Sequence, residues 1–191
     1  MTPSSNLGFY GWLMLVSIGV LVFIMNIDYT AVNIALVPIA NDIEGDLSTL
    51  QWLLSGYVLI WAALVVPAGR FADIHGKKFS LILGLSLFMA GSLITGLGNQ
   101  IAGPSVGRLI QGLGAALFSS PAYGLIFTSV PQEKQGMAMG FVVGTAGLGL
   151  AVGPSLAGWM INEIGWRWLF YINLPLGLAV IVVLWFYAQA D

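Results

Sequence analysis

The chain has 191 residues, of which 58% are hydrophobic and 7% charged, and its mean hydropathy is +0.92. Soluble domains carry about 25% charged residues, so this composition excludes a soluble protein and makes lipid the expected solvent. There is no cysteine and one histidine, which excludes a disulfide framework and a thiolate metal site. The net charge of −2 says little, because only the distribution of charge between loops orients a membrane protein.

Six apolar segments long enough to cross a bilayer follow one another along the chain. After a short polar tail at residues 1–8, we expect helices over about 10–39, 50–68, 79–97, 103–127, 136–161 and 167–187. No basic residues precede the first segment, and it leads into a polar motif, so we interpret it as a retained helix and not as a signal peptide. The sequence predicts an all-α, polytopic membrane protein with a single six-helix bundle over residues 1–191.

Charge is divided unequally between the two sides of this bundle. The second-to-third and fourth-to-fifth connections hold Arg70, Lys77, Lys78 and Lys134, whereas the first connection, residues 41–48, has three carboxylates and no Lys or Arg. The positive-inside rule therefore predicts that both termini are cytoplasmic. We expect a multi-pass protein of the plasma membrane, which is the inner membrane in a bacterium.

The connection after the second predicted helix is residues 69–78, GRFADIHGKK, which we call the basic hairpin. Its glycines allow a tight turn, and Asp73 lies among three basic residues, so its charge is expected to be compensated. An ordinary basic turn between two membrane helices would look similar.

The first predicted helix carries a carboxylate inside its membrane-spanning part. Because a charge there is costly unless it faces protein or water, Asp28 is a functional candidate and a possible proton carrier. Asn26, Thr30 and Asn33 share one face of this helix, and Asp28 lies roughly opposite, about 200° from Asn26. Either set could line a cavity while the other bonds a neighbouring helix. The alternative is that Asp28 is a paired packing residue near the outer end.

The fourth predicted helix contains RLIQGLGAA, which begins at Arg108. A guanidinium inside a bundle needs an acceptor, and it can bias the proton affinity of a nearby carboxylate. Arg108 shares a face with Gly112, Ala115 and Ser119, a stripe that lets another helix come close. The alternative is snorkelling, in which Arg108 reaches water at the outer boundary.

The glycines of the fifth predicted helix fall on opposite faces. One face holds Gly140, Gly144, Gly147, Ala151 and Gly158, and the other holds Gly149 and Gly153. Such a helix can pack closely against two neighbours, and Pro154 bends it, which suits a gate that slides and re-packs. In the second helix, Tyr57 and Trp61 are one turn apart and could stack on a lipophilic cation, although such aromatic residues more often pack in a core or at an interface.

These segments resemble motifs of the major facilitator superfamily, and in particular of its fourteen-helix drug:proton antiporters. The basic hairpin is similar to the family pattern Gly-x-x-x-Asp-Arg-x-Gly-Arg/Lys-Arg/Lys, with Ile74 in place of the Arg. Residues 26–38, NIDYTAVNIALVP, resemble the antiporter signature LDxTxVNxALP with one extra residue, and RLIQGLGA matches RxxQGxGA. The fifth helix resembles the antiporter motif, with Ala157 at a usual glycine, and WRWLFYINLPLG at 166–177 is close to WRWxFxINxPxG.

The resemblance implies the N-terminal six-helix half of a major facilitator fold, a 3+3 inverted repeat, and proton-coupled export by alternating access. The residue patterns and the resemblance together give as candidates for proton coupling and the substrate pathway Asp28, Asn33, Tyr57, Trp61, Arg108 and Gln111. Those for cytoplasmic gating are Gly69, Asp73, Gly76, Lys77 and Lys78, and those of the antiporter helix are Gly149, Gly153, Pro154 and Gly158.

The implied partners are the bilayer, protons, a small lipophilic substrate, and a second transporter half or a second copy of the chain. The second half is needed because polar or small faces of several helices would otherwise lack a partner in lipid. We expect no cofactor, metal or nucleic acid, and no enzymatic activity, because no nucleophile–base or phosphate-binding pattern is present. The alternatives are a non-transporting membrane subunit or remnant, and an exporter of a metabolite or siderophore.

Overall fold

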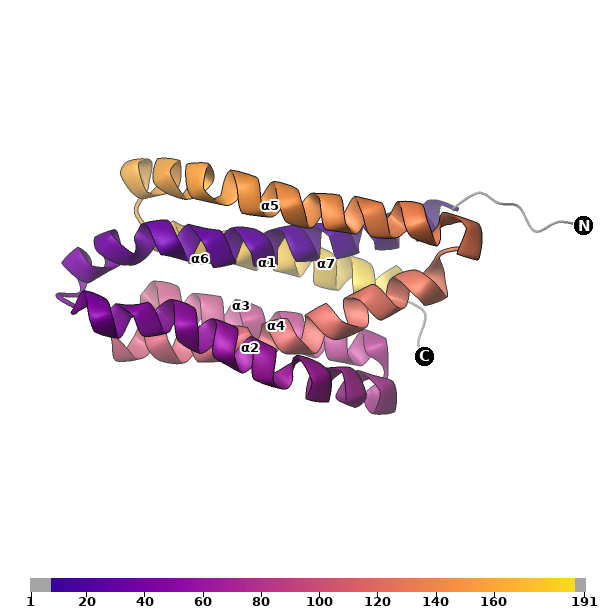
Figure 1. Cartoon of the computed structure of the whole chain (residues 1–191), viewed down its shortest axis with the longest axis horizontal. Coiled ribbons are helices and arrows are strands. Elements are labelled where there is room, and N and C mark those ends of the chain that lie inside the picture. Colours follow the sequence, from indigo (N-terminus) through magenta and orange to yellow (C-terminus); the bar gives the residue numbers. More distant parts are fainter. Residues whose placement is uncertain (1–7, 188–191) are drawn as a thin grey trace, which may run out of the picture.

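The computed structural model describes residues 8–187, so the predicted polar tail lies outside the described residues except for Gly8. The chain forms a bundle of long helices that run roughly parallel to one axis (Figure 1). The long helices are α1 (Phe9–Asp42), α2 (Leu47–His75), α3 (Lys77–Leu97), α4 (Ala102–Ser129), α5 (Gln135–Glu163) and α7 (Asn173–Tyr187). A 3₁₀ turn, η1 (Gln132–Lys134), and a short helix, α6 (Trp168–Tyr171), complete the described elements.

Six segments in the described range are long and apolar enough to cross a membrane. The last of them combines α6 and α7. The prediction of an all-helical, polytopic membrane protein is therefore confirmed.

The second helix is longer than the sequence analysis predicted, and the basic hairpin is not a loop. Expected over 50–68, α2 starts at Leu47 and continues to His75, so most of residues 69–78 is helical. The reversal of direction is made at Gly76, whose φ of 96° lies in a region that favours glycine. Gly69 has a packing role instead of a turn role, because a Cβ added there would lie 2.6 Å from Ser120 Oγ on α4.

The sixth helix, predicted as continuous over 167–187, is divided near Ile172 into α6 and α7. Pro175 explains the break. It has no N–H to donate to the carbonyl of Tyr171, and in a continuous helix its ring would clash with that carbonyl. The first helix, predicted over 10–39, continues to Asp42 and includes Pro38.

The helices pack as pairs that agree with the expected inverted repeat. α1 packs on α5 and α4 packs on α2, while α3 packs on α4 and α7. Exchanging α1 with α4 and α2 with α5, as the repeat requires, converts the first pair into the second.

The buried core consists of two apolar clusters, one toward each end of the bundle. On α1, Met14–Ile24 contribute to one cluster and Ala31–Ala40 to the other, so the segment around Asp28 lies between them. In Figure 1 the junctions α2–α3 and α4–α5 lie at one end of the bundle, and the junctions α1–α2 and α5–α6 lie at the other. A polar site is thus enclosed midway between the two ends.

Candidate functional site

An ion pair joins α1 and α4 in the middle of the bundle. Arg108 Nη1 donates to Asp28 Oδ2, and the side chains of the two residues are 0% and 1% exposed. The pair is buried, and a buried ion pair is stable only when further hydrogen bonds satisfy its remaining polar atoms.

Amide and hydroxyl groups from three helices complete the site around Asp28. Gln111 Nε2 on α4 donates to Asp28 Oδ1 at 3.1 Å, and Asn173 Nδ2 on α7 donates to the same oxygen at 3.2 Å. Both amides also donate to Ser92 Oγ on α3, at 2.7 and 3.1 Å. The five side chains are each at most 2% exposed, and they form what we call the buried network.

The guanidinium of Arg108 makes further contacts beyond Asp28. Its Nε donates to the carbonyl of Leu53 on α2 at 3.1 Å, and Nη1 also donates to Gln111 Oε1 at 3.0 Å. Its Cζ lies 4.2 Å from the ring centroid of Tyr57, a cation–π geometry. Nη2 is buried and has no hydrogen-bond partner among the described residues. One strong donor of the network is therefore uncommitted.

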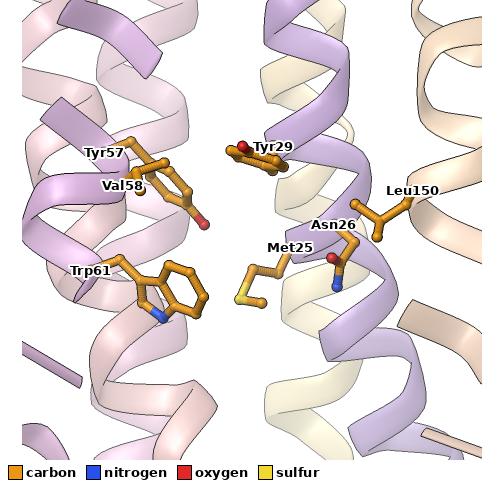
Figure 2. Close-up of a pocket in the computed structure, with 7 residues that line it drawn as sticks. All are labelled: Met25, Asn26, Tyr29, Tyr57, Val58, Trp61 and Leu150. Carbon is orange, nitrogen blue, oxygen red and sulfur yellow. The ribbon is translucent and has the colours of Figure 1, made fainter. Parts of the chain in front are cut away.

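A pocket of about 280 Å³ lies beside this network, between α1, α2 and α5. Figure 2 shows its walls: Tyr57, Val58 and Trp61 of α2 face Met25 and Tyr29 of α1 across an open space, with Asn26 and Leu150 on the side toward α5. The walls are mostly apolar and aromatic, which is typical of a site for a lipophilic ligand.

Tyr57 belongs to both the pocket and the surroundings of the network. Its ring covers the Arg108 guanidinium, while its hydroxyl points into the open space in Figure 2. Trp61, one turn further along α2, is held in place by a hydrogen bond from its Nε1 to Ser119 Oγ on α4 at 3.1 Å. The pocket is therefore separated from the ion pair by one aromatic side chain.

At the end of the bundle marked by Gly76, Asp73 is exposed and forms no ion pair with the described basic residues. The expected compensation by Arg70, Lys77 and Lys78 therefore does not take the form of a direct ion pair. Arg70 lies one turn before Asp73 on α2, and both lysines lie on α3 beyond the turn. Lys78 Nζ instead donates to the Trp185 carbonyl near the end of α7 at 2.8 Å, where a cation is favoured by the helix dipole.

The two glycine faces of α5 differ in their surroundings. Gly149 and Gly153 lie against α1: an added Cβ would lie 2.8 Å from the Phe23 carbonyl oxygen at the first position and 1.9 Å from Thr30 Oγ1 at the second. The opposite face is open, since an added Cβ would meet no described atom within 4 Å at Gly140, Gly144, Gly147 and Gly158. The predicted division of the helix into two faces is confirmed.

Comparison with known proteins identifies the family to which this architecture belongs. The family model for the Major Facilitator Superfamily matches residues 18–191. The chain belongs to the major facilitator superfamily. It is accordingly a multi-pass membrane protein of a transporter family and not an enzyme.

Individual members of the superfamily are also similar to the chain. It is 35% identical over 181 residues to the tetracenomycin C resistance and export protein of Streptomyces glaucescens. The aligned region covers 95% of this chain and 34% of that protein. It is 34% identical to multidrug resistance protein Stp of Mycobacterium tuberculosis (93% and 33%) and 31% identical to multidrug transporter protein MdtP of Bacillus subtilis (89% and 31%). The chain spans about a third of the length of these relatives.

Against this superfamily background, the structure brings most of the predicted site residues together. Asp28, Arg108 and Gln111 meet in the buried network, and Tyr57 and Trp61 line the pocket. Asn33 joins neither, because it is exposed and its Nδ2 donates to the carbonyl of Tyr29 at 3.1 Å.

The structure also decides two alternatives that the sequence left open. On α1, Asn26 lines the pocket while Asp28 bonds neighbouring helices. Snorkelling of Arg108 is wrong, since its side chain is fully buried and paired. The stripe that begins at Arg108 faces α2, as the closeness of a Cβ on Gly112 to the Tyr57 carbonyl (2.7 Å) shows.

Sequence reasoning missed Ser92 and Asn173 as members of the buried network. Both are polar side chains inside apolar membrane helices, which is the signal that could have found them. Met25, Tyr29, Val58 and Leu150 were also not assigned to a pocket, because they are unremarkable in a membrane helix and only the packing of α1, α2 and α5 brings them together.

Proposed function

We propose that this chain forms the N-terminal half of a proton-coupled exporter of small lipophilic compounds that works by alternating access. The observation that carries the proposal is the Asp28–Arg108 ion pair, enclosed at the centre of an apolar bundle and separated from a pocket by Tyr57. Ionisable groups at such depth are costly and are generally kept for function.

Asp28 is the proposed proton carrier. As a carboxylate it holds Arg108, Gln111 and Asn173, and so it ties α1 to α4 and α7. A proton on Asp28 removes the charge that attracts Arg108, weakens these ties, and shifts the balance between two arrangements of the helices. In this scheme Arg108 tunes when Asp28 takes up and releases the proton.

A second set of helices is proposed to complete the transport path. The open face of α5 and the exposed flank of α2, which includes Leu59 and Val66, are suited to helix–helix contact. The partner is a second transporter half or a second copy of this chain. Through Gly149, Gly153 and Pro154, α5 is proposed to slide on α1 during the transition, while its opposite face, with Gly158, contacts the partner.

The basic hairpin is proposed to act at the cytoplasmic end as a gate. Gly69 allows α2 to approach α4, Gly76 makes the sharp reversal, and Asp73 presents an exposed carboxylate. Lys77 and Lys78 begin α3 and add positive charge. This charge distribution supports a cytoplasmic location for this end, and with it for both termini.

The nature of the substrate is proposed from the pocket and from the relatives. Their names refer to tetracenomycin C and to multidrug resistance or transport. The apolar and aromatic lining of the pocket supports a compound of comparable lipophilic character for this chain.

The proposal is tested in inside-out vesicles that contain the 191-residue chain and have an acidic interior reported by the dye ACMA. We expect 2-(hydroxymethyl)anthraquinone to dissipate the proton gradient, because export into the vesicle is exchanged for protons. Ethidium is tested beside it as a lipophilic cation, so that transport is also detected if the chain exports cations. Asp28→Asn should abolish this response, whereas Glu163→Gln, an exposed carboxylate at the end of α5, should retain it. An equal response of both variants contradicts the role of Asp28. Absence of any response from a correctly inserted chain contradicts transport by this chain without a second half.

A further inference from the structure

The pocket has no charged residue in its walls to balance a ligand's charge. Its seven lining residues are neutral: Met25, Asn26, Tyr29, Tyr57, Val58, Trp61 and Leu150. The adjacent carboxylate, Asp28, is 2% exposed and already receives hydrogen bonds from Arg108, Gln111 and Asn173. A cationic ligand would therefore leave water without gaining an available anion.

Tyr57 further disfavours a cation at this position. One face of its ring is occupied by the Arg108 guanidinium, with Cζ 4.2 Å from the centroid. A cation on the other side of the ring would compete for the same π electrons and would lie close to a like charge in a medium of low dielectric constant. The stacking of a lipophilic cation on Tyr57, which the sequence suggested, is thus opposed by the structure.

The groups that the pocket does offer are aromatic surfaces and a hydrogen-bond donor. Tyr29, Tyr57 and Trp61 supply flat apolar area, and the Tyr57 hydroxyl points into the space without a hydrogen bond to any described residue. Trp61 Nε1 donates to Ser119, and one of the two N–H groups of Asn26 Nδ2 donates to the Val22 carbonyl. Behind the Tyr57 ring lies the uncommitted Nη2 of Arg108. Arg108 Nη2 is buried and does not line the pocket, so the Tyr57 hydroxyl is a donor that a ligand there can reach, and it favours a ligand that accepts a hydrogen bond.

We propose that this pocket binds flat aromatic molecules that are neutral or anionic and carry a hydrogen-bond acceptor, and that Tyr57 is the residue that selects them. The inference rests on the proposed transport function, since it names the substrate class of the same pocket. The cavity of about 280 Å³ is close to the lower end of the range for ligand pockets, about 300 Å³, and suits a compact ring system.

The test uses ligands of one ring system that differ only in charge. The probes are 2-(hydroxymethyl)anthraquinone, anthraquinone-2-carboxylate and the (anthraquinon-2-yl)methyl-trimethylammonium cation. Dissociation constants are measured for the 191-residue chain in nanodiscs by equilibrium dialysis, with empty nanodiscs to correct for partition into lipid. A fourth probe, 2-(hydroxymethyl)anthracene, keeps the flat ring but lacks the quinone acceptors.

We expect the neutral and anionic quinones to bind at least about tenfold more tightly than the cation, because of the buried guanidinium. Tyr57→Phe keeps the ring over Arg108 and removes the hydroxyl. It should therefore raise the dissociation constant of the neutral quinone by about fivefold and leave that of the anthracene unchanged. Tyr123→Phe, a half-buried tyrosine outside the pocket, is the matched control and should change neither.

A double variant tests the origin of the charge preference. Asp28→Asn with Arg108→Gln removes both charges while keeping polar side chains, and it should bring the affinities of the cation and the anion to within about twofold of each other. Equal or tighter binding of the cation by the unmodified chain would overturn the inference, as would failure of all four probes to bind.

These results are separable from the vesicle experiment. If the chain prefers the cation and also shows proton-coupled flux, the proposed export function is supported and the proposed substrate class is contradicted. If the affinities are as expected but no flux is seen, the proposed substrate class is supported and transport by this chain alone is contradicted.

Discussion

Gly153 on α5 and Thr30 on α1 touch so closely that no side chain fits between the two helices at this level. A Cβ added to Gly153 would lie 1.9 Å from Thr30 Oγ1 and 3.2 Å from Thr30 Cβ. Thr30 Oγ1 is itself hydrogen-bonded to the Asn26 carbonyl at 3.0 Å, so rotating it away breaks a bond. The contact between α1 and α5 therefore depends on this glycine.

Gly153→Ala should destabilise the bundle, and Gly144→Ala should not. At Gly153 the helices must separate or Thr30 must give up its hydrogen bond, at a cost of about 1–3 kcal/mol for overpacking. At Gly144 an added Cβ meets no described atom within 4 Å, and alanine also favours the helix. The measurement is the free energy of unfolding in mixed detergent micelles. Equal effects of the two substitutions would contradict the structural difference between the two faces.

The α5 helix shows what the sequence could and could not determine. The helical period alone separated Gly149 and Gly153 from Gly140, Gly144 and Gly158, and this separation was right. It could not say which face is buried in the chain, because both faces consist of small residues with similar hydrophobicity. That choice depends on Thr30 and Phe23, which are more than a hundred residues away in the sequence.

Arg108→Gln should destabilise the bundle more than the double substitution Asp28→Asn with Arg108→Gln. The single variant leaves Asp28 as a buried charge without its counter-ion, at a cost of about 3–5 kcal/mol. The double variant removes both charges and keeps at position 28 an amide oxygen that can accept from Gln111 and Asn173, so it should recover most of the loss. Thermal unfolding in detergent measures both variants, and a double variant as unstable as the single one would contradict the assigned pairing.

The buried network was only half predictable for a related reason. Asp28 and Arg108 were candidates because a charge in a membrane helix is conspicuous, and the motif added Gln111. Ser92 and Asn173 carry no charge, and their role depends on α3 and α7 meeting beside α1, which no local pattern encodes.

Gly76→Ala should cost about 1–3 kcal/mol of stability, because a residue with a Cβ is strained at φ 96° and ψ 137°. Gly136→Ala is the control: it lies near the start of α5, has no positive φ, and an added Cβ meets no described atom within 4 Å. Urea- or detergent-induced unfolding of the two variants measures the difference. A neutral Gly76→Ala would contradict the turn geometry.

The basic hairpin was mispredicted because its composition was interpreted as a loop signal. The polar residues of 69–75 continue α2 as a helix beyond its apolar part, and Gly69 is needed for contact with Ser120 and not for a turn. Charge marks where a membrane segment leaves the hydrocarbon region, and it does not mark where the helix ends.

Asp42→Ala should loosen the end of the bundle opposite to Gly76, with a small change in global stability. Asp42 pairs with Arg167 at 2.5 Å and accepts a hydrogen bond from Trp166 Nε1 at 3.2 Å, and Arg167 also reaches Asn99 Oδ1 at 3.1 Å. The ion pair is partly exposed, with side chains 31% and 44% accessible, so its loss should cost no more than about 1 kcal/mol.

The local effect of Asp42→Ala should exceed this global one, because the cluster joins α1 to the α3–α4 and α5–α6 connections. We expect faster amide hydrogen exchange around Asn99 and Trp166, and little change in the middle of α4. Glu163→Ala removes an exposed carboxylate from the end of α5 that forms no ion pair with the described residues, and it should leave exchange at Asn99 unchanged. High salt should accelerate exchange at Asn99 in the unmodified chain and reduce its difference from Asp42→Ala, since an exposed pair is screened. Exchange at Asn99 that responds neither to Asp42→Ala nor to salt would show that this cluster does not hold the connections together.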